Sequence, residues 1–130
     1  MPVWPHRGEV WMIDFSPARG SEQAGLRPAV VIQNDVGNQY AATTIVAAIT
    51  TTIKPYPVTV VVEKGEGGLP RRSMVNLAQL LTLDKSRLRR LLGVMSEERM
   101  RMIDQAIKPE AEDPGRQPGG ESLQPQAGSA

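Results

Sequence analysis

The order of hydrophobic and polar residues divides the chain into short apolar runs separated by turn-forming residues. β-branched and other bulky side chains dominate these runs, and Gly, Pro, Asn or Asp follow each one, which is typical of strands. The pattern predicts five strands, over residues 8–15, 27–34, 43–51, 58–63 and 74–83. Between them we expect a loop at 16–26, a turn at 35–38, an interruption at 54–57 and an open loop at 65–70.

The last third of the chain predicts one helix after an ambiguous segment. Residues 84–95 fit either a short helix capped by Asp84 or a further strand. Ser96 is a good N-cap, and acidic residues follow it in the first helical turn, where they favour the helix dipole. Pro109 ends the helix, whose apolar face is formed by Met100, Ile103, Ala106 and Ile107.

These elements predict one domain and a tail. Residues 109–130 consist mainly of Pro, Gly, Gln, Ser, Glu and Ala, and cannot bury enough apolar surface to offset their ordering entropy. We therefore expect a domain over 1–108 and a disordered acidic tail over 109–130. Several short strands followed by one helix indicate a mainly β (α+β) fold, a small half-open β-barrel with a C-terminal helix packed on it.

Composition narrows the function classes. A chain of 130 residues suits a single core, and the absence of Cys excludes disulfides and thiolate chemistry. No apolar stretch is long enough to span a bilayer, and the first residues lack the apolar core of a signal peptide, so we expect a cytoplasmic protein without membrane contact. Residues 1–108 hold 14 Lys or Arg against 10 Asp or Glu, a net charge of +4, which is compatible with a nucleic-acid partner.

One motif is more informative than the rest: a polar loop with two glycines leads into Arg27, Pro28 and an apolar run. The residue before a proline favours extended backbone, and proline suits a first strand position, so Arg27 should lie at the start of a strand. This would hold a guanidinium beside a loop, as phosphate recognition requires. From the residues alone, a surface ion pair for Arg27 remains an alternative.

Several segments together resemble the MazF/PemK family of type II toxin endoribonucleases. They span roughly residues 7–108 and comprise Gly8-Glu9-Val10-Trp11, the stretch from Gly20 to Asn34, Ile45-Val46-Ala47-Ala48-Ile49-Thr50, Leu80 to Lys85, and the last helix. The resemblance implies an SH3-like barrel, a homodimer, and metal-independent cleavage of single-stranded RNA that leaves a 2′,3′-cyclic phosphate and a 5′-hydroxyl. It also implies a cognate MazE-like antitoxin that blocks the RNA site.

The resemblance also implies roles for particular residues. Arg27 and Thr50 correspond to the catalytic pair, while Ser21, Glu22 and Gln23 fall on the loop expected to cover RNA. Gln79 is a further candidate RNA contact. Around it the chain departs from the family pattern: Ala78 stands where relatives often carry an acidic residue, and Leu81 where they often carry a basic one, which would change the bases that are read.

Basic residues elsewhere are weaker candidates. Arg71 and Arg72 follow the Gly-rich loop and are candidate phosphate contacts. Three further arginines, Arg87, Arg89 and Arg90, fit a solvated or interfacial face better than an RNA site.

The residue types present limit the possible chemistry. Many metal-independent ribonucleases use two histidines, whereas this chain has only His6. No cluster of His and carboxylates has metal-ligand spacing, so we expect neither a metal nor another cofactor. RNA cleavage would then depend on Arg27 and the hydroxyl of Thr50. Whether Arg27 is a general acid or a phosphate clamp stays open at this point.

Two other functions fit a similar fold. A gyrase-poisoning toxin of the CcdB type would need an aromatic-bearing C-terminal end, whereas this sequence ends in Gln126-Ala127-Gly128-Ser129-Ala130. An RNA-binding module without catalysis is the other alternative, and the presence of both Arg27 and Thr50 argues against it.

Overall fold

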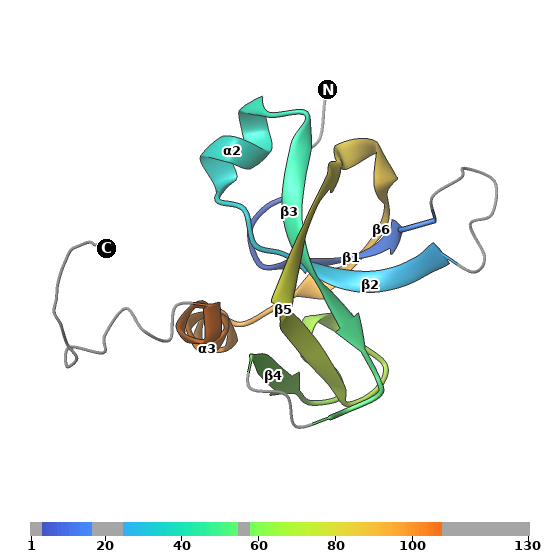
Figure 1. Cartoon of the computed structure of the whole chain (residues 1–130), viewed down its shortest axis with the longest axis vertical. Helices are drawn as coiled ribbons and strands as arrows, with labels where there is room; N and C mark the ends of the chain where they lie inside the picture. The colour runs from blue at the N-terminus through green and yellow to red at the C-terminus, as the bar shows by residue number, and fades with distance from the viewer. Residues whose placement is uncertain (1–3, 17–24, 55–57, 108–130) are drawn as a thin grey trace, which may run out of the picture.

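The described part of the protein is built around one antiparallel sheet (Figure 1). The computed structural model describes residues 4–16, 25–54 and 58–107, except for the side chain of Gln79. Within them, six strands lie in the order β4-β5-β3-β2-β1-β6, and β4 and β6 remain its two edges. Their bounds are β1 Glu9–Asp14, β2 Leu26–Val31, β3 Thr43–Thr50, β4 Thr59–Val62, β5 Ser73–Asp84 and β6 Leu88–Val94. The prediction of a mainly β, half-open barrel is confirmed.

A long, bent strand makes the sheet curve. Ala47 of β3 pairs with Leu80 of β5, but Ile49 pairs with Val75, so two steps along β3 correspond to five along β5. Such an irregularity bends a strand and increases its twist. The first half of β5 therefore pairs with β4 and with the end of β3, and the second half pairs with the start of β3.

The central strands are buried on both faces. Val30 and Val31 point to opposite sides of β2, and both are fully buried. Val30 belongs to the larger core cluster, with Val10, Ile49 and Val75 among its members. Val31 belongs to a smaller cluster with Ile13, Ala29 and Val46. Continuous apolar runs, rather than strict alternation, are expected for such strands.

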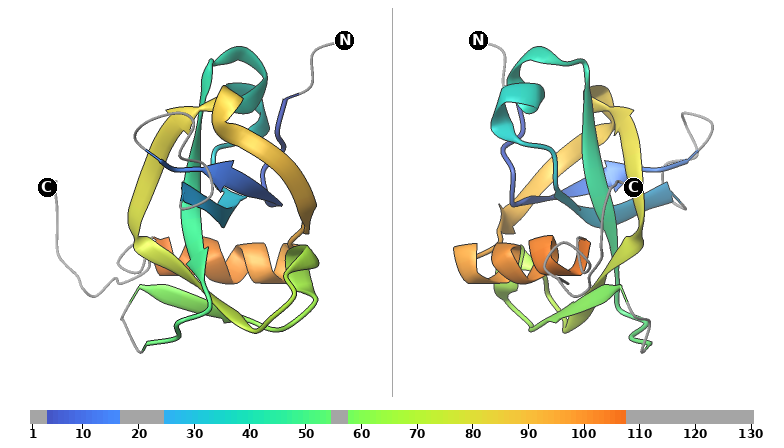
Figure 2. Two further views of the ribbon diagram at one scale, coloured as in Figure 1. Left: turned by 90° about the vertical axis from the view of Figure 1, so that its right-hand side faces the viewer. Right: turned by 60° about the vertical axis from the view of Figure 1, so that its left-hand side comes forward.

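Helix α3, Glu97–Ile107, completes the larger cluster. Ser96 Oγ accepts a hydrogen bond from the Arg99 N–H at 3.1 Å, as predicted for an N-cap. Ile103 is fully buried, and Met100, Ala106 and Ile107 pack around it, which confirms the predicted apolar face. Figure 2 shows α3 lying beside β4 and the adjoining half of β5.

The prediction of a turn at 35–38 is wrong, because residues Asp35–Tyr40 form helix α2. Asn34 caps it by accepting a hydrogen bond from the Gly37 N–H at 2.9 Å. Asn38 is fully buried; its Nδ2 donates to the Gln33 carbonyl at 2.8 Å and its Oδ1 accepts from the Thr44 hydroxyl at 2.7 Å. These tertiary contacts stabilise a helix too short to persist alone.

The prediction of an open loop at 65–70 is also wrong, because this segment contains a compact 3₁₀ turn at Glu66–Gly68. Leu69 is 2% exposed, and a side chain at Gly68 (φ 76°) would overlap the backbone oxygen of Leu92. Arg99 Nη2 donates to Glu66 Oε1 at 2.7 Å, which joins the turn to α3 and lowers the pKa of Glu66. The turn is therefore fixed between β6 and α3.

The ambiguous segment at 84–95 contains both a turn and a strand. Asp84 accepts a hydrogen bond from the Ser86 N–H at 3.0 Å and begins a 3₁₀ turn, Lys85–Arg87. β6 follows and pairs with β1. Among the described residues, no helix is long and apolar enough to cross a membrane.

Candidate active site

A cavity of about 350 Å³ opens where the ends of β2 and β3 separate. The pairing of these strands ends at Ala29 with Ala48, although both strands continue. Its described lining contains no Asp, Glu or His; the apolar part includes Met12, Pro28, Ile49, Leu69 and Leu92, and the polar part is Arg27, Thr50, Thr51, Arg71 and Ser73. A pocket that combines an apolar lining with a few polar and positively charged groups suits a small, negatively charged part of a ligand.

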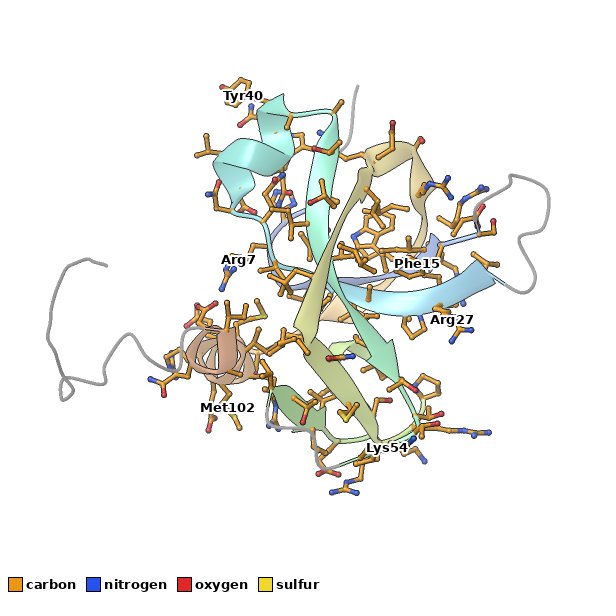
Figure 3. All side chains as sticks on the ribbon, in the orientation of Figure 1. Arg7, Phe15, Arg27, Tyr40, Lys54 and Met102 are labelled. Atoms are coloured by element: carbon orange, nitrogen blue, oxygen red, sulfur yellow. The ribbon has the colours of Figure 1, made fainter. Side chains whose placement is uncertain are left out.

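Arg27 is the second residue of β2, which confirms its predicted place at the start of a strand. It pairs with Ile13 of β1, and Pro28 pairs with Met12, so the backbone of Arg27 is held by the sheet. Its side chain is exposed and extends from the end of β2 toward solvent (Figure 3). Within the described part of the chain, the guanidinium makes no hydrogen bond or ion pair, so its donors are available to a ligand.

Thr50 is the last residue of β3 and is half-buried. Its Oγ1 accepts a hydrogen bond from the Thr52 N–H at 3.1 Å. One lone pair of the hydroxyl is therefore engaged, and its O–H donates to no other residue in ranges 4–16, 25–54 and 58–107. The fold brings this donor and the guanidinium of Arg27 to one cavity from two neighbouring strands.

Comparison with known proteins identifies the family of this chain. The family model for the PemK-like, MazF-like toxins of type II toxin–antitoxin systems matches residues 6–109. The chain belongs to this family. It is 47% identical over 103 residues to the Endoribonuclease MazF of Staphylococcus saprophyticus, a match that covers 78% of this chain and 86% of that protein. The predicted family resemblance is thus confirmed.

Several solved structures have the same fold. One is a mycobacterial endoribonuclease in complex with its cognate antitoxin; the TM-score is 0.68 at 25% identity, over 81% of this chain and 92% of that one. Another is a MazF from Deinococcus radiodurans, with a TM-score of 0.68 at 23% identity, over 83% of this chain and 96% of that one. The second similarity concerns the fold alone.

The other predicted site residues fall in three groups. Arg71 lines the cavity, whereas Arg72 lies outside its lining and pairs with Glu63 at 3.3 Å on the exposed surface. Gln79 is in β5, but its side chain lies outside the described part. Ser21, Glu22 and Gln23 also lie outside it. His6 is exposed and contacts the ring of Trp4 and the carboxylate of Glu9 rather than the cavity.

Sequence reasoning missed a buried carboxylate beside the site. Asp14, at the end of β1, is 1% exposed and accepts hydrogen bonds from the hydroxyl and N–H of Ser16 and from Arg89. The hydrogen bonds from Ser16, together with the charges of Arg89 and Arg87, lower the pKa of Asp14. A charged residue inside an apolar run was the available signal, since a buried carboxylate needs partners.

Arg87 fastens the same end of β1. Its Nη1 donates to the carbonyl of Asp14 at 2.9 Å and to that of Ser16 at 2.7 Å. The Phe15 N–H donates to the Gly25 carbonyl at 2.9 Å, directly before β2 begins. Arg87 and Arg89 therefore hold the end of β1 that pairs with Arg27 of β2.

Another hollow, of about 750 Å³, lies between β4 and α3 and does not include Arg27 or Thr50 in its lining. It is lined by Thr59, Val60, Val61, Glu98, Arg101 and Met102 among others. No group of three or more His, Asp or Glu residues in the described ranges is arranged to hold a metal ion.

Proposed function

We propose that this chain is the toxin of a type II toxin–antitoxin system and acts as a sequence-specific, metal-independent endoribonuclease on single-stranded RNA. The observation that carries the proposal is that Arg27 and Thr50 lie in one cavity of a MazF-family fold, and that the guanidinium and the O–H have no partner among the described residues. Cleavage of messenger RNA would inhibit translation and growth.

The reaction is an internal transesterification. The RNA 2′-oxygen loses its proton and attacks the neighbouring phosphorus, the bond from phosphorus to the 5′-oxygen breaks, and that oxygen takes up a proton. The products are a 2′,3′-cyclic phosphate and a 5′-hydroxyl. Negative charge accumulates on the phosphate oxygens in the transition state, which is where fixed donors contribute most.

Arg27 supplies the positive charge for this step. A guanidinium keeps its protons in proteins and binds phosphate oxygens through two parallel hydrogen bonds. We therefore assign Arg27 as a phosphate clamp that stabilises the transition state. Thr50 donates its O–H to a phosphate oxygen or to the 2′-oxygen, while the Thr52 N–H fixes its orientation. This chemistry needs no metal, because the clamp provides the charge.

The remaining candidate residues would bind the RNA on either side of the phosphate that Arg27 holds. Arg71 lies in the cavity lining, next to the proposed phosphate position. Arg72 can exchange its exposed partner Glu63 for a phosphate, because such surface ion pairs are worth little. Ser21, Glu22, Gln23 and Gln79 stay predictions as base or backbone contacts.

The proposed partners are a second copy of the chain and an acidic, MazE-like antitoxin in the cytoplasm. The basic charge of residues 1–108 would attract an acidic segment and give fast, salt-sensitive association. We propose that residues 1–108 form the toxin domain and that 109–130 are dispensable. Sedimentation of the full chain and of a chain lacking 111–130 tests both points: each should be dimeric at micromolar concentration.

The decisive experiment is incubation of the purified protein with a long synthetic RNA in excess EDTA, followed by mapping of the new 5′ ends. We expect cleavage at a short recurring sequence, 5′-hydroxyl ends, and no cleavage of single-stranded DNA. RNA binding without cleavage would support the non-catalytic module instead. Loss of cleavage in EDTA, or equal cleavage of DNA, would contradict the mechanism.

A further inference from the structure

Three arginines of the β6 side, Arg87, Arg89 and Arg90, look equivalent in the sequence but differ in the structure. Arg87 donates to two main-chain carbonyls, and Arg89 pairs with the buried carboxylate of Asp14 at 3.0 Å. Arg90 is exposed and, within the described residues, has no hydrogen bond or ion pair. Two of the three therefore have structural partners, and one guanidinium remains available.

The strand register sets Arg90 beside the candidate active site. Arg90 pairs with Met12 of β1, and Met12 pairs with Pro28 of β2. Residues directly opposite each other in an antiparallel pair share one face of the sheet. Met12 and Pro28 both line the cavity, so Arg90 lies on the cavity face, one strand beyond its lining.

The spacing suits a nucleic-acid strand. Neighbouring strands are about 4.8 Å apart, so the two steps from Pro28 to Arg90 span about 10 Å. A stacked strand carries one phosphate per ~3.4 Å, so this corresponds to about three nucleotides, and to fewer in an extended strand. A phosphate held in the cavity and a phosphate held by Arg90 would thus be two different phosphates of one RNA.

We propose that Arg90 is a second phosphate-binding residue, which holds the RNA backbone on the β6 side of the cavity, away from the cleaved bond. The inference rests on the proposed function. It concerns the phosphate chain rather than base identity, because Arg90 presents an exposed positive charge that no other described residue engages, beside a cavity that is itself cationic. Arg87 and Arg89 are excluded from this role by their bonds around Asp14.

The test measures binding of a single-stranded DNA oligonucleotide of the mapped cleavage sequence, which lacks the attacking 2′-hydroxyl. Affinity is measured over a range of salt concentrations for the wild type, R90A, R90K and R101A. Arg101 is the matched control, because it is an exposed arginine on α3 that lines the separate hollow against β4. Thermal melts verify that all variants are folded.

Loss of one phosphate contact to a single strand should lower the slope of log affinity against log salt by about 0.7, which is about fivefold in affinity at 0.1 M salt. We expect this for R90A, whereas R90K retains the slope and R101A matches the wild type. A wild-type slope in R90A would overturn the inference, as would an equal loss in R101A. Failure of the wild type to cleave RNA would instead overturn the proposed function, and the inference with it.

Discussion

Arg89 of β6 donates a hydrogen bond to the carboxylate of Asp14 at 3.0 Å, although Arg89 is half exposed and Asp14 is 1% exposed. The pair joins the end of β1, which aligns Arg27 in β2, to the edge strand of the sheet. A buried charge without its partners is costly, so removal of this contact should lower the free energy of unfolding by a measurable amount.

Asp14→Asn should lower the free energy of unfolding by about 1–3 kcal/mol, because the amide cannot satisfy the donors of both Ser16 and Arg89. The matched control is Asp104→Asn, whose half-exposed carboxylate pairs with Arg7; its loss should cost at most about 1 kcal/mol. Urea denaturation of both variants measures the difference. Equal losses of unfolding free energy in the two variants would show that the burial of Asp14 does not increase the cost of its removal.

The same carboxylate predicts a response to acid. The folded pKa of Asp14 is lower than its unfolded value, so its contribution to stability is present above the unfolded pKa. It is lost as the pH falls from about 5 toward the lower folded pKa. The stability gap between wild type and Asp14→Asn should therefore shrink with acidification. Glu66 shifts in the same direction but is present in both proteins. A gap independent of pH would contradict this assignment.

Arg27→Ala and Thr50→Ala should each reduce RNA cleavage by about 10²-fold or more without loss of the fold. Thr50→Ser keeps the hydroxyl and should retain most of the activity. Thr82→Ala, at an exposed threonine of β5, controls for loss of a strand hydroxyl elsewhere. Single-turnover cleavage, circular dichroism and thermal melts separate catalysis from folding. Full activity in a folded Arg27→Ala protein would refute the phosphate clamp.

The glycine turn beside the cavity provides a fourth prediction. Gly65 and Gly68 both have positive φ, but an added methyl group at Gly65 meets no atom within 4 Å, whereas at Gly68 it overlaps the Leu92 backbone. Gly65→Ala should cost about 1–2 kcal/mol from backbone strain alone. Gly68→Ala should cost clearly more, and should also lower RNA cleavage because Leu92 lines the cavity. Similar melting temperatures for the two variants would contradict this packing.

The sequence by itself determined the elements whose signal is local. Apolar runs between turn residues predicted five of the six strands, and the spacing of Met100, Ile103, Ala106 and Ile107 predicted the buried face of α3. The Arg-Pro pair placed Arg27 at the start of β2, because proline restricts the residue before it. These features depend on near neighbours in the chain, so they can be read without a fold.

Tertiary contacts decided the rest. α2 exists because Asn38 finds partners in Gln33 and Thr44, and the turn at Glu66–Gly68 is compact because β6 and α3 hold it. The three arginines are also distinguished only by the folded structure. Arg90 pairs with Met12 across β1 and β6, whereas the guanidinium of Arg89 is engaged by the carboxylate of Asp14. The physical reason is that the free energy comes from contacts between different elements, including the one from the Arg7 N–H to the Asp35 carboxylate at the start of α2, which local propensity does not include.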